Sequence, residues 1–148
     1  MRIVIGSDHA GFPLKSTIVE FVKSLGHEVD DVGSYDPEPV DFPDIARRVT
    51  DKINAGQAQR GLMVCGTGVG ASIAANKVKG IRAAVCHDVH SAHQSVEHDD
   101  VNVMCIGAQI VGPWLAKDLV EAYLKAEFST DEDFRRRVSK LADMDSER

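Results

Sequence analysis

A cysteine followed at once by alternating glycines is the feature of this sequence best suited to chemistry. Cys65 ends a short apolar run, and Gly66, Gly68 and Gly70 follow at every second position. The next residues, 71–77, are typical of a helix. A strand, a glycine loop and a helix in this order can bind an anion, because the bare amides of the loop point at it. A thiol placed there could act as a nucleophile or as a base.

The glycine loop lacks the residues that common phosphate-binding loops need. Residues 66–76 contain neither Lys nor Arg, whereas a Walker A loop requires Lys and a phosphatase loop requires an Arg soon after the Cys. A relaxed dinucleotide fingerprint does fit residues 66–71, with Asp88 downstream, but this match would follow the third strand instead of the first. We therefore interpret the loop as a site for a small oxyanion that forms during a reaction.

The cysteines allow two interpretations. Cys65 could be a small buried hydrophobe, or it could be a thiolate favoured by the N-terminus of the following helix. Cys86 and Cys105 have no such loop, and we predict that they belong to the core. Three widely spaced cysteines argue against a disulfide framework and favour a reducing compartment, the cytoplasm.

Further polar residues could take part in chemistry. Asp8 and His9 directly follow an apolar run, where an Asp is also an ordinary turn or cap residue. Four more histidines are close in sequence: His87, His90, His93 and His98. A zinc site would need a better set of ligands, so we predict no metal and expect most of these histidines at the surface. Residues 99–102, which follow His98, form a polar cluster that we expect to contribute little to packing.

Short apolar runs alternate with helix-period segments along the whole chain. This alternation is typical of a single α/β domain with a parallel sheet covered on both faces. The predicted strands lie at about 3–5, 28–32, 62–65, 83–86 and 103–106, and the predicted helices at about 13–25, 42–55, 71–77, 89–97, 113–126 and 130–145.

In such a sheet, ligands bind beyond the carboxyl ends of the strands, near the point where the strand order reverses. The loops expected at that edge carry Asp8, Asp41, residues 65–70, His87 and Gly107. The formal charge of −6 argues against a nucleic acid or an anionic membrane as the main partner. No apolar stretch approaches the roughly 18 to 20 residues of a membrane span, and we expect a soluble cytoplasmic protein.

Several motifs, taken together, closely resemble one family. They are Gly6-Ser7-Asp8-His9-Ala10-Gly11, Val40-Asp41-Phe42-Pro43, residues 65–70, Ala74-Ala75-Asn76-Lys77, Gly80-Ile81-Arg82-Ala83 and Glu97-His98-Asp99-Asp100-Val101-Asn102. Their order and spacing resemble the ribose-5-phosphate isomerase B family, whose relatives include the galactose-6-phosphate isomerase subunits. The resemblance covers nearly the whole chain.

The resemblance implies an architecture and a reaction. The fold would be a Rossmann-like three-layer α/β/α domain, residues 1–148, with a five-stranded parallel sheet. The protein would be a homodimer, often paired into tetramers, with active sites shared between subunits, and the helix at about 130–145 would pack at a subunit interface. The implied reaction is aldose–ketose isomerisation through an enediolate, without metal or cofactor.

The resemblance also implies residue roles, which agree with the chemistry. Moving a carbonyl between C1 and C2 requires a base and a clamp for the enediolate oxygen. By resemblance, the Cys65 thiolate moves the proton between the carbons, Thr67 helps to move protons between O1 and O2, and His98 opens the sugar ring with help from Asp8. The implied substrate-binding residues are His9, Asp41, Phe42, Gly66, Gly68, Val69, Gly70, Ser72, Asp99, Gln109, Asp133 and Arg137.

Three positions depart from the pattern of many members of this family. Gln109 and Asp133 stand where arginines that bind phosphate are usual, and Asp99 stands where a neutral amide is usual. Charge-assisted hydrogen bonds contribute about 1.5 to 3 kcal/mol each, so phosphate binding should be weakened unless Arg135 or Arg136 substitutes.

The expected substrate pair is ribose 5-phosphate and ribulose 5-phosphate or a related sugar. Two alternatives stay open. One is an isomerase of a non-phosphorylated or different sugar, for example one with six carbons. The other is a catalytically silent module that binds a sugar or a nucleotide.

Overall fold

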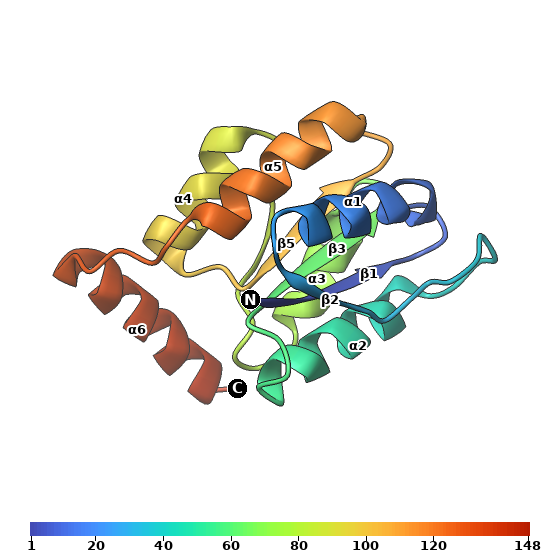
Figure 1. Cartoon of the computed structure of the whole chain (residues 1–148). Coiled ribbons are helices and arrows are strands. Elements are labelled where there is room, and N and C mark those ends of the chain that lie inside the picture. Colours follow the sequence, from blue (N-terminus) through green and yellow to red (C-terminus); the bar gives the residue numbers. More distant parts are fainter.

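The chain forms three layers, with helices on both faces of one sheet, in a computed structural model that describes residues 1–148 (Figure 1). Five parallel strands run in the order β2-β1-β3-β5-β4. They are β1 Arg2–Ser7, β2 Glu28–Asp31, β3 Arg60–Cys65, β4 Ala83–Val85 and β5 Val103–Gly107. The predicted Rossmann-like fold is confirmed, and the strand ends differ from the expected ones by at most two residues.

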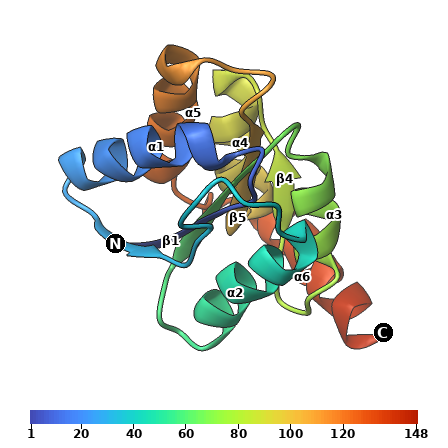
Figure 2. The same cartoon turned by 90° about the vertical axis from the view of Figure 1, so that its right-hand side faces the viewer.

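The helices divide between the two faces of the sheet (Figure 2). One face carries α1 Phe12–Ser24, α4 Val89–Asp99 and α5 Pro113–Lys125, and the other carries α2 Phe42–Asn54 and α3 Val69–Asn76. Gly26 and Gly56 follow α1 and α2 with φ of 90° and 72°. This left-handed backbone favours glycine, as expected where a helix stops.

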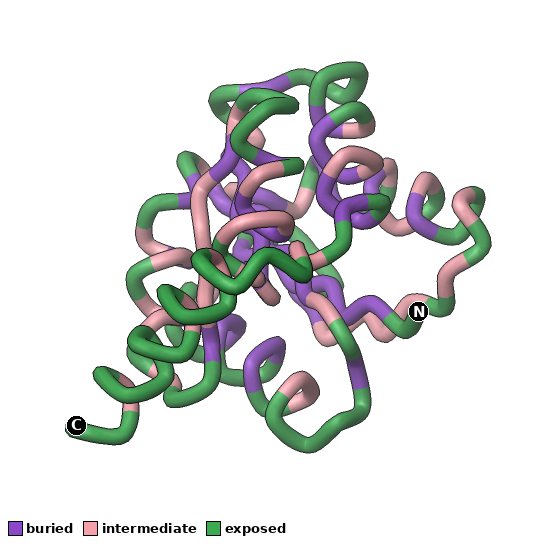
Figure 3. Tube along the Cα trace, turned by 90° about the vertical axis from the view of Figure 1, so that its left-hand side faces the viewer, coloured by how far each residue is buried: buried purple, intermediate pink, exposed green.

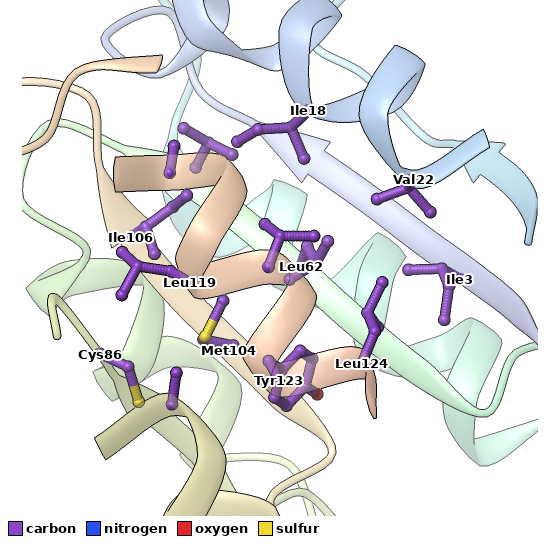
Figure 4. Close-up of a cluster of buried hydrophobic side chains, with 14 of the residues drawn as sticks. Ile3, Ile18, Val22, Leu62, Cys86, Met104, Ile106, Leu119, Tyr123 and Leu124 are labelled. Atoms are coloured by element: carbon purple, nitrogen blue, oxygen red, sulfur yellow. The ribbon is translucent and has the colours of Figure 1, made fainter. Parts of the chain in front are cut away.

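Apolar side chains fill the space between each helical layer and the sheet. On the face of α5, Leu119 and Tyr123 contact Met104 and Ile106 of β5 (Figure 4). Cys86 and Cys105 are buried in the two cores, so their core assignment is confirmed. Burial raises the pKa of both thiols, which keeps them protonated.

The order of the strands brings two loops together at one edge. The chain passes from β1 to β2 on one side and then returns to place β3 on the other side of β1. Ser7 pairs with Val64 in register, so the loops that follow β1 and β3 begin next to each other. This reversal point is where α/β sheets bind their ligands.

The last helix, α6 (Glu132–Ser146), lies away from the main body of the protein (Figure 1). It has no buried residue, and its tube is almost wholly exposed in Figure 3. Hydrogen bonds join both ends to the rest of the chain: Ser129 N–H donates to the Glu97 carbonyl at 3.0 Å before the helix begins, Gly80 N–H donates to Asp145 Oδ2 at 2.6 Å near its end, and Arg148 Nη2 donates to the Asn76 carbonyl at 2.9 Å after it. No helix in the structure is both long and apolar enough to cross a membrane.

Strand β2 lies at one edge of the sheet and is strongly acidic. Three of its four residues are carboxylates, and each pairs with a cation from a neighbouring element: Glu28 with Arg2 at 2.9 Å, Asp30 with Lys52 at 3.2 Å and Asp31 with Lys15 at 2.8 Å. The Lys15 ammonium is almost wholly buried and also donates to the Ser34 carbonyl.

Candidate active site

The Cys65 thiol lies at the carboxyl end of β3 and contacts the glycine loop. Its Sγ accepts a hydrogen bond from Gly68 N–H at 3.0 Å, and the residue is 6% exposed. Gly68 has φ of 83° and is the N-cap of α3. Negative charge on a sulfur atom is stabilised by an amide donor and by the N-terminus of a helix. The geometry therefore favours the reactive interpretation of Cys65.

Amides of the loop are available to an oxyanion. The N–H groups of Gly66, Thr67 and Gly70 make no hydrogen bond within the chain, whereas Val69 N–H donates to Thr67 Oγ1 at 3.3 Å. Ser72 N–H makes the first bond of the helix, to the Gly68 carbonyl at 3.0 Å. Preorganised donors beside a buried thiol are suited to a charge that develops next to it.

The residues at the end of β5 contact the backbone of the glycine loop. Ala108 N–H donates to the Cys65 carbonyl at 2.8 Å, and Gln109 N–H donates to the Gly66 carbonyl at 3.0 Å. A Cβ atom at Gly107 would lie 2.6 Å from both the Gly66 carbonyl oxygen and Thr67 Cα. The backbones are therefore in direct contact, and the position of Gly107 determines the position of the loop.

Asp8 lies beside Cys65 and forms a turn. Its Oδ1 accepts a hydrogen bond from Gly11 N–H at 2.9 Å, and the residue is 8% exposed. A Cβ atom at Gly11 would lie 1.9 Å from the Val64 carbonyl oxygen, so this turn lies directly on the end of β3. The turn interpretation of Asp8 is confirmed, and its Oδ2 has no partner in the chain.

Three other predicted residues belong to the segment that follows β1 or to the beginning of α2. His9 Nδ1 accepts a hydrogen bond from Val40 N–H at 3.2 Å, which holds the segment that precedes α2. Asp41, the N-cap of α2, is exposed, and its side chain makes no capping bond. The Phe42 ring lies over Gly70, where a Cβ atom would be 2.8 Å from Cζ.

The side chain of Gln109 lies over Gly66, 3.2 Å from where a Cβ would stand. The carboxyl edge therefore combines a thiol, two carboxylates, free amides and an aromatic ring.

Within one chain, His98 lies at the amino edge of the sheet, opposite the carboxyl edge that carries Cys65. Helix α4 begins after the carboxyl end of β4, spans about 16 Å in its eleven residues and ends before the amino end of β5. His98 is in the last turn of α4, where its ring stacks on Phe134 of α6 with centroids 3.9 Å apart. Asp99 is exposed beside it. A single chain therefore does not bring His98 close to Cys65.

The arginines of α6 differ in what they contact. Arg135 donates from Nε to the Ser129 carbonyl at 2.9 Å, and Arg136 pairs with Asp133 at 2.7 Å. Arg137 lies over the Phe134 ring at 5.7 Å and has no carboxylate partner. Among the three, only Arg137 combines a free guanidinium with a place next to the ring that stacks on His98.

The expectation that the polar cluster after His98 contributes little to packing was wrong. Asp100 pairs with Arg82 at 3.1 Å, and Asn102 bridges Arg82 N–H at 2.8 Å and the Gly80 carbonyl at 2.9 Å. These residues therefore join α4 to the amino end of β4 and do contribute to packing.

His87, which the sequence places in a loop at the carboxyl edge of the sheet, is half-buried there, whereas His90 and His93 are exposed. Its Nε2 accepts a hydrogen bond from Gly107 N–H at 2.9 Å. The sequence predicts its place at the carboxyl end of β4 but not this hydrogen bond. No group of three or more His, Cys, Asp or Glu side chains is arranged to hold a metal ion.

Comparisons with known proteins agree with this geometry. The family described as Ribose/Galactose Isomerase matches residues 3–141. Ribose-5-phosphate isomerase B of Escherichia coli (strain K12) is 45% identical over 127 residues, which cover 86% of this chain and 85% of that protein. D-erythrulose-4-phosphate isomerase of Pectobacterium atrosepticum is 45% identical over 131 residues, with coverage of 86% and 85%.

The same similarity holds in three dimensions. The structure of Clostridium thermocellum ribose-5-phosphate isomerase B superposes with a TM-score of 0.96 and 46% identity, and 99% of each chain is covered. A matched family over nearly the whole length, together with relatives that are named isomerases, leaves one conclusion. The chain belongs to the ribose/galactose isomerase family and is an enzyme that isomerises sugars.

Proposed function

We propose that this enzyme interconverts an aldose phosphate and a ketose phosphate through an enediolate, with ribose 5-phosphate and ribulose 5-phosphate as the substrate pair. The observation that carries the proposal is the contact between Cys65 Sγ and Gly68 N–H at 3.0 Å, beside amides without partners. The relatives named for ribose 5-phosphate and for D-erythrulose 4-phosphate support a phosphorylated sugar and leave its length open.

The proposed chemistry assigns a role to the thiol, the free amides, Thr67 and Asp8. The Cys65 thiolate removes the proton from C2 of the open-chain aldose and returns it to C1. The amides of Gly66, Thr67 and Gly70 hold the enediolate oxygen, where preformed donors are most effective. The Thr67 hydroxyl moves the proton between O1 and O2, and Asp8 Oδ2 accepts a hydrogen bond from a sugar hydroxyl.

The position of His98 leads us to propose that two copies of the chain build each site. A ring-opening base is needed next to Cys65, and within one chain His98 is at the other edge of the sheet. In the proposed homodimer, the partner subunit's His98 fills this role. The apolar Val69 and Ile73 of α3, which are 52% and 57% exposed beside the loop, support a second copy on this face.

Phosphate would be bound by Arg137 of the partner subunit. Asp133 does not oppose this, because its charge is paired with Arg136. A second candidate, isomerisation of a free or longer sugar, is favoured by Gln109. Its neutral amide lies over the loop where a cation would attract phosphate.

A substrate panel tests these candidates. We expect kcat/KM to be highest for a phosphorylated pentose when four-, five- and six-carbon aldoses are compared with and without phosphate in one assay. A preference for the free sugars would favour the second candidate. Binding of sugars without any turnover would indicate the silent module and contradict both.

A mixing experiment tests the roles of Cys65 and His98. Cys65→Ala and His98→Ala should each abolish turnover, and Cys86→Ala and His90→Ala serve as controls that retain it. Equal amounts of the two inactive variants, dissociated and allowed to reassociate, should recover about a quarter of wild-type activity, because half of the random dimers are mixed and each holds one intact site. Folded mixtures without activity would contradict the shared site.

A further inference from the structure

The ladder of hydrogen bonds between β4 and β5 ends early. The paired residues are Ala83 with Val103, Ala84 with Met104 and Val85 with Cys105, and the last backbone bond runs from Cys86 N–H to the Cys105 carbonyl at 3.2 Å. In a parallel ladder, alternate residues face the same neighbouring strand. The backbone N–H of Gly107 therefore points to the side of β4, as the backbone groups of Cys105 do. Strand β4 ends at Val85, however, and offers no carbonyl at this position.

The His87 imidazole fills the place of the missing carbonyl. Its Nε2 accepts from Gly107 N–H at 2.9 Å, which satisfies a donor in a buried residue. A ring nitrogen that accepts cannot carry a proton, so the neutral ring carries its hydrogen on Nδ1. An unpaired buried amide is unfavourable, and this bond therefore keeps the end of β5 in line with the sheet.

The end of β5 transmits this restraint to the glycine loop. Gly107 is the register partner of Cys65, and its backbone is in contact with Gly66 and Thr67. The next residue, Ala108, donates its N–H to the Cys65 carbonyl at 2.8 Å. A displacement of Gly107 must therefore move the thiol or the free amides beside it.

We infer that His87 is a positioning residue, which holds the Cys65 loop in its reactive geometry by accepting the Gly107 amide hydrogen bond. The inference rests on the proposed function, because it concerns the same loop. His87 does not need to touch the sugar. Its effect should appear in the enediolate step, since the loop amides are matched to a charge that forms only after the sugar has bound.

The test compares His87→Leu with His87→Gln. Leu removes the acceptor, whereas the Gln Oε1 can reach the position of the imidazole Nε2 and cannot be protonated there. His90→Leu is the matched control, because His90 is exposed in the first turn of α4, three residues further along the chain, and no hydrogen bond involves its side chain. Hydrogen exchange of the Gly107 amide, measured by NMR on the full chain, shows whether its hydrogen bond is present. The values of kcat and KM show whether the Cys65 loop keeps its reactive geometry.

We expect His87→Leu to speed exchange at Gly107 and to lower kcat about tenfold, while KM changes less than about twofold. His87→Gln should restore both quantities, and His90→Leu should change neither. Unchanged exchange in His87→Leu would overturn the inference. Faster exchange together with lower stability and an unchanged kcat would also overturn it, since His87 would then only stabilise the fold.

The inference can be separated from the proposed function. If the wild-type enzyme converts no sugar in the panel, the proposed function fails, but the Gly107 amide still reports the hydrogen bond. In that case, shifts of the Gly66 and Thr67 amide resonances in His87→Leu that return in His87→Gln would support positioning, and unshifted resonances would overturn it.

Discussion

Replacing Gly107 by Ala tests the contact between β5 and the glycine loop. The added Cβ would stand 2.6 Å from the Gly66 carbonyl oxygen and from Thr67 Cα, whereas ordinary contact begins at 3.4 Å. The loop must move by the difference, about 0.8 Å, because backbone atoms on both sides cannot rotate away. A misplacement of about 1 Å in an active site can lower the rate about a hundredfold. We therefore expect kcat/KM to fall between about tenfold and a hundredfold.

The stability of the same variant is part of the prediction. Inserting a methyl group into a well-packed site costs about 1 to 3 kcal/mol, which is less than the total stability of most domains. The variant should therefore remain folded, and urea unfolding followed by circular dichroism measures the loss.

Gly112→Ala is the control for Gly107→Ala, because no atom lies within 4 Å of its added Cβ. Its kcat/KM should stay within about twofold of wild type. Wild-type turnover of Gly107→Ala would refute the claim that β5 determines the position of the loop.

Two further variants test other parts of the chain. Tyr123→Phe should leave the free energy of unfolding unchanged or raise it by up to about 1 kcal/mol, because the buried hydroxyl has no partner and the ring contacts remain. A clear loss of stability on urea unfolding would contradict this expectation. Arg137→Ala should raise KM for a phosphorylated sugar at least tenfold, whereas Lys140→Ala on the same helix should not, and equal values for both variants would exclude Arg137 as the phosphate ligand.

The sheet and the thiol loop were predictable because they depend on local sequence. Alternating apolar and helix-period segments specify a parallel sheet, and Gly68 is needed where the backbone has φ of 83°. The carboxyl-edge rule then correctly grouped Asp8, Asp41 and Cys65 without knowledge of the function.

The contacts of individual polar side chains were not predictable in this way. Arg136 and Arg137 are adjacent in sequence, yet one pairs with Asp133 and the other lies on Phe134. The role of His87 depends on where β4 ends: its last residue, Val85, pairs with Cys105, and β5 continues for two more residues. Strand ends are set by tertiary packing. The distance between His98 and Cys65, by contrast, follows from the predicted alternation, because a helix that joins two parallel strands runs antiparallel to them and ends at the amino edge of the sheet.

The acidic edge strand limits how copies of this protein can associate. Two copies that paired along β2 to form one continuous sheet would place Glu28, Asp30 and Asp31 opposite the same carboxylates of the other copy. Each carboxylate already holds a cation of its own chain, so the facing edges would have to rearrange these ion pairs or bring like charges together, and charged edge strands protect proteins from edge-to-edge aggregation. This edge of the sheet is therefore poorly suited to extension by a second copy, and the helical surfaces are better candidates for contacts between copies.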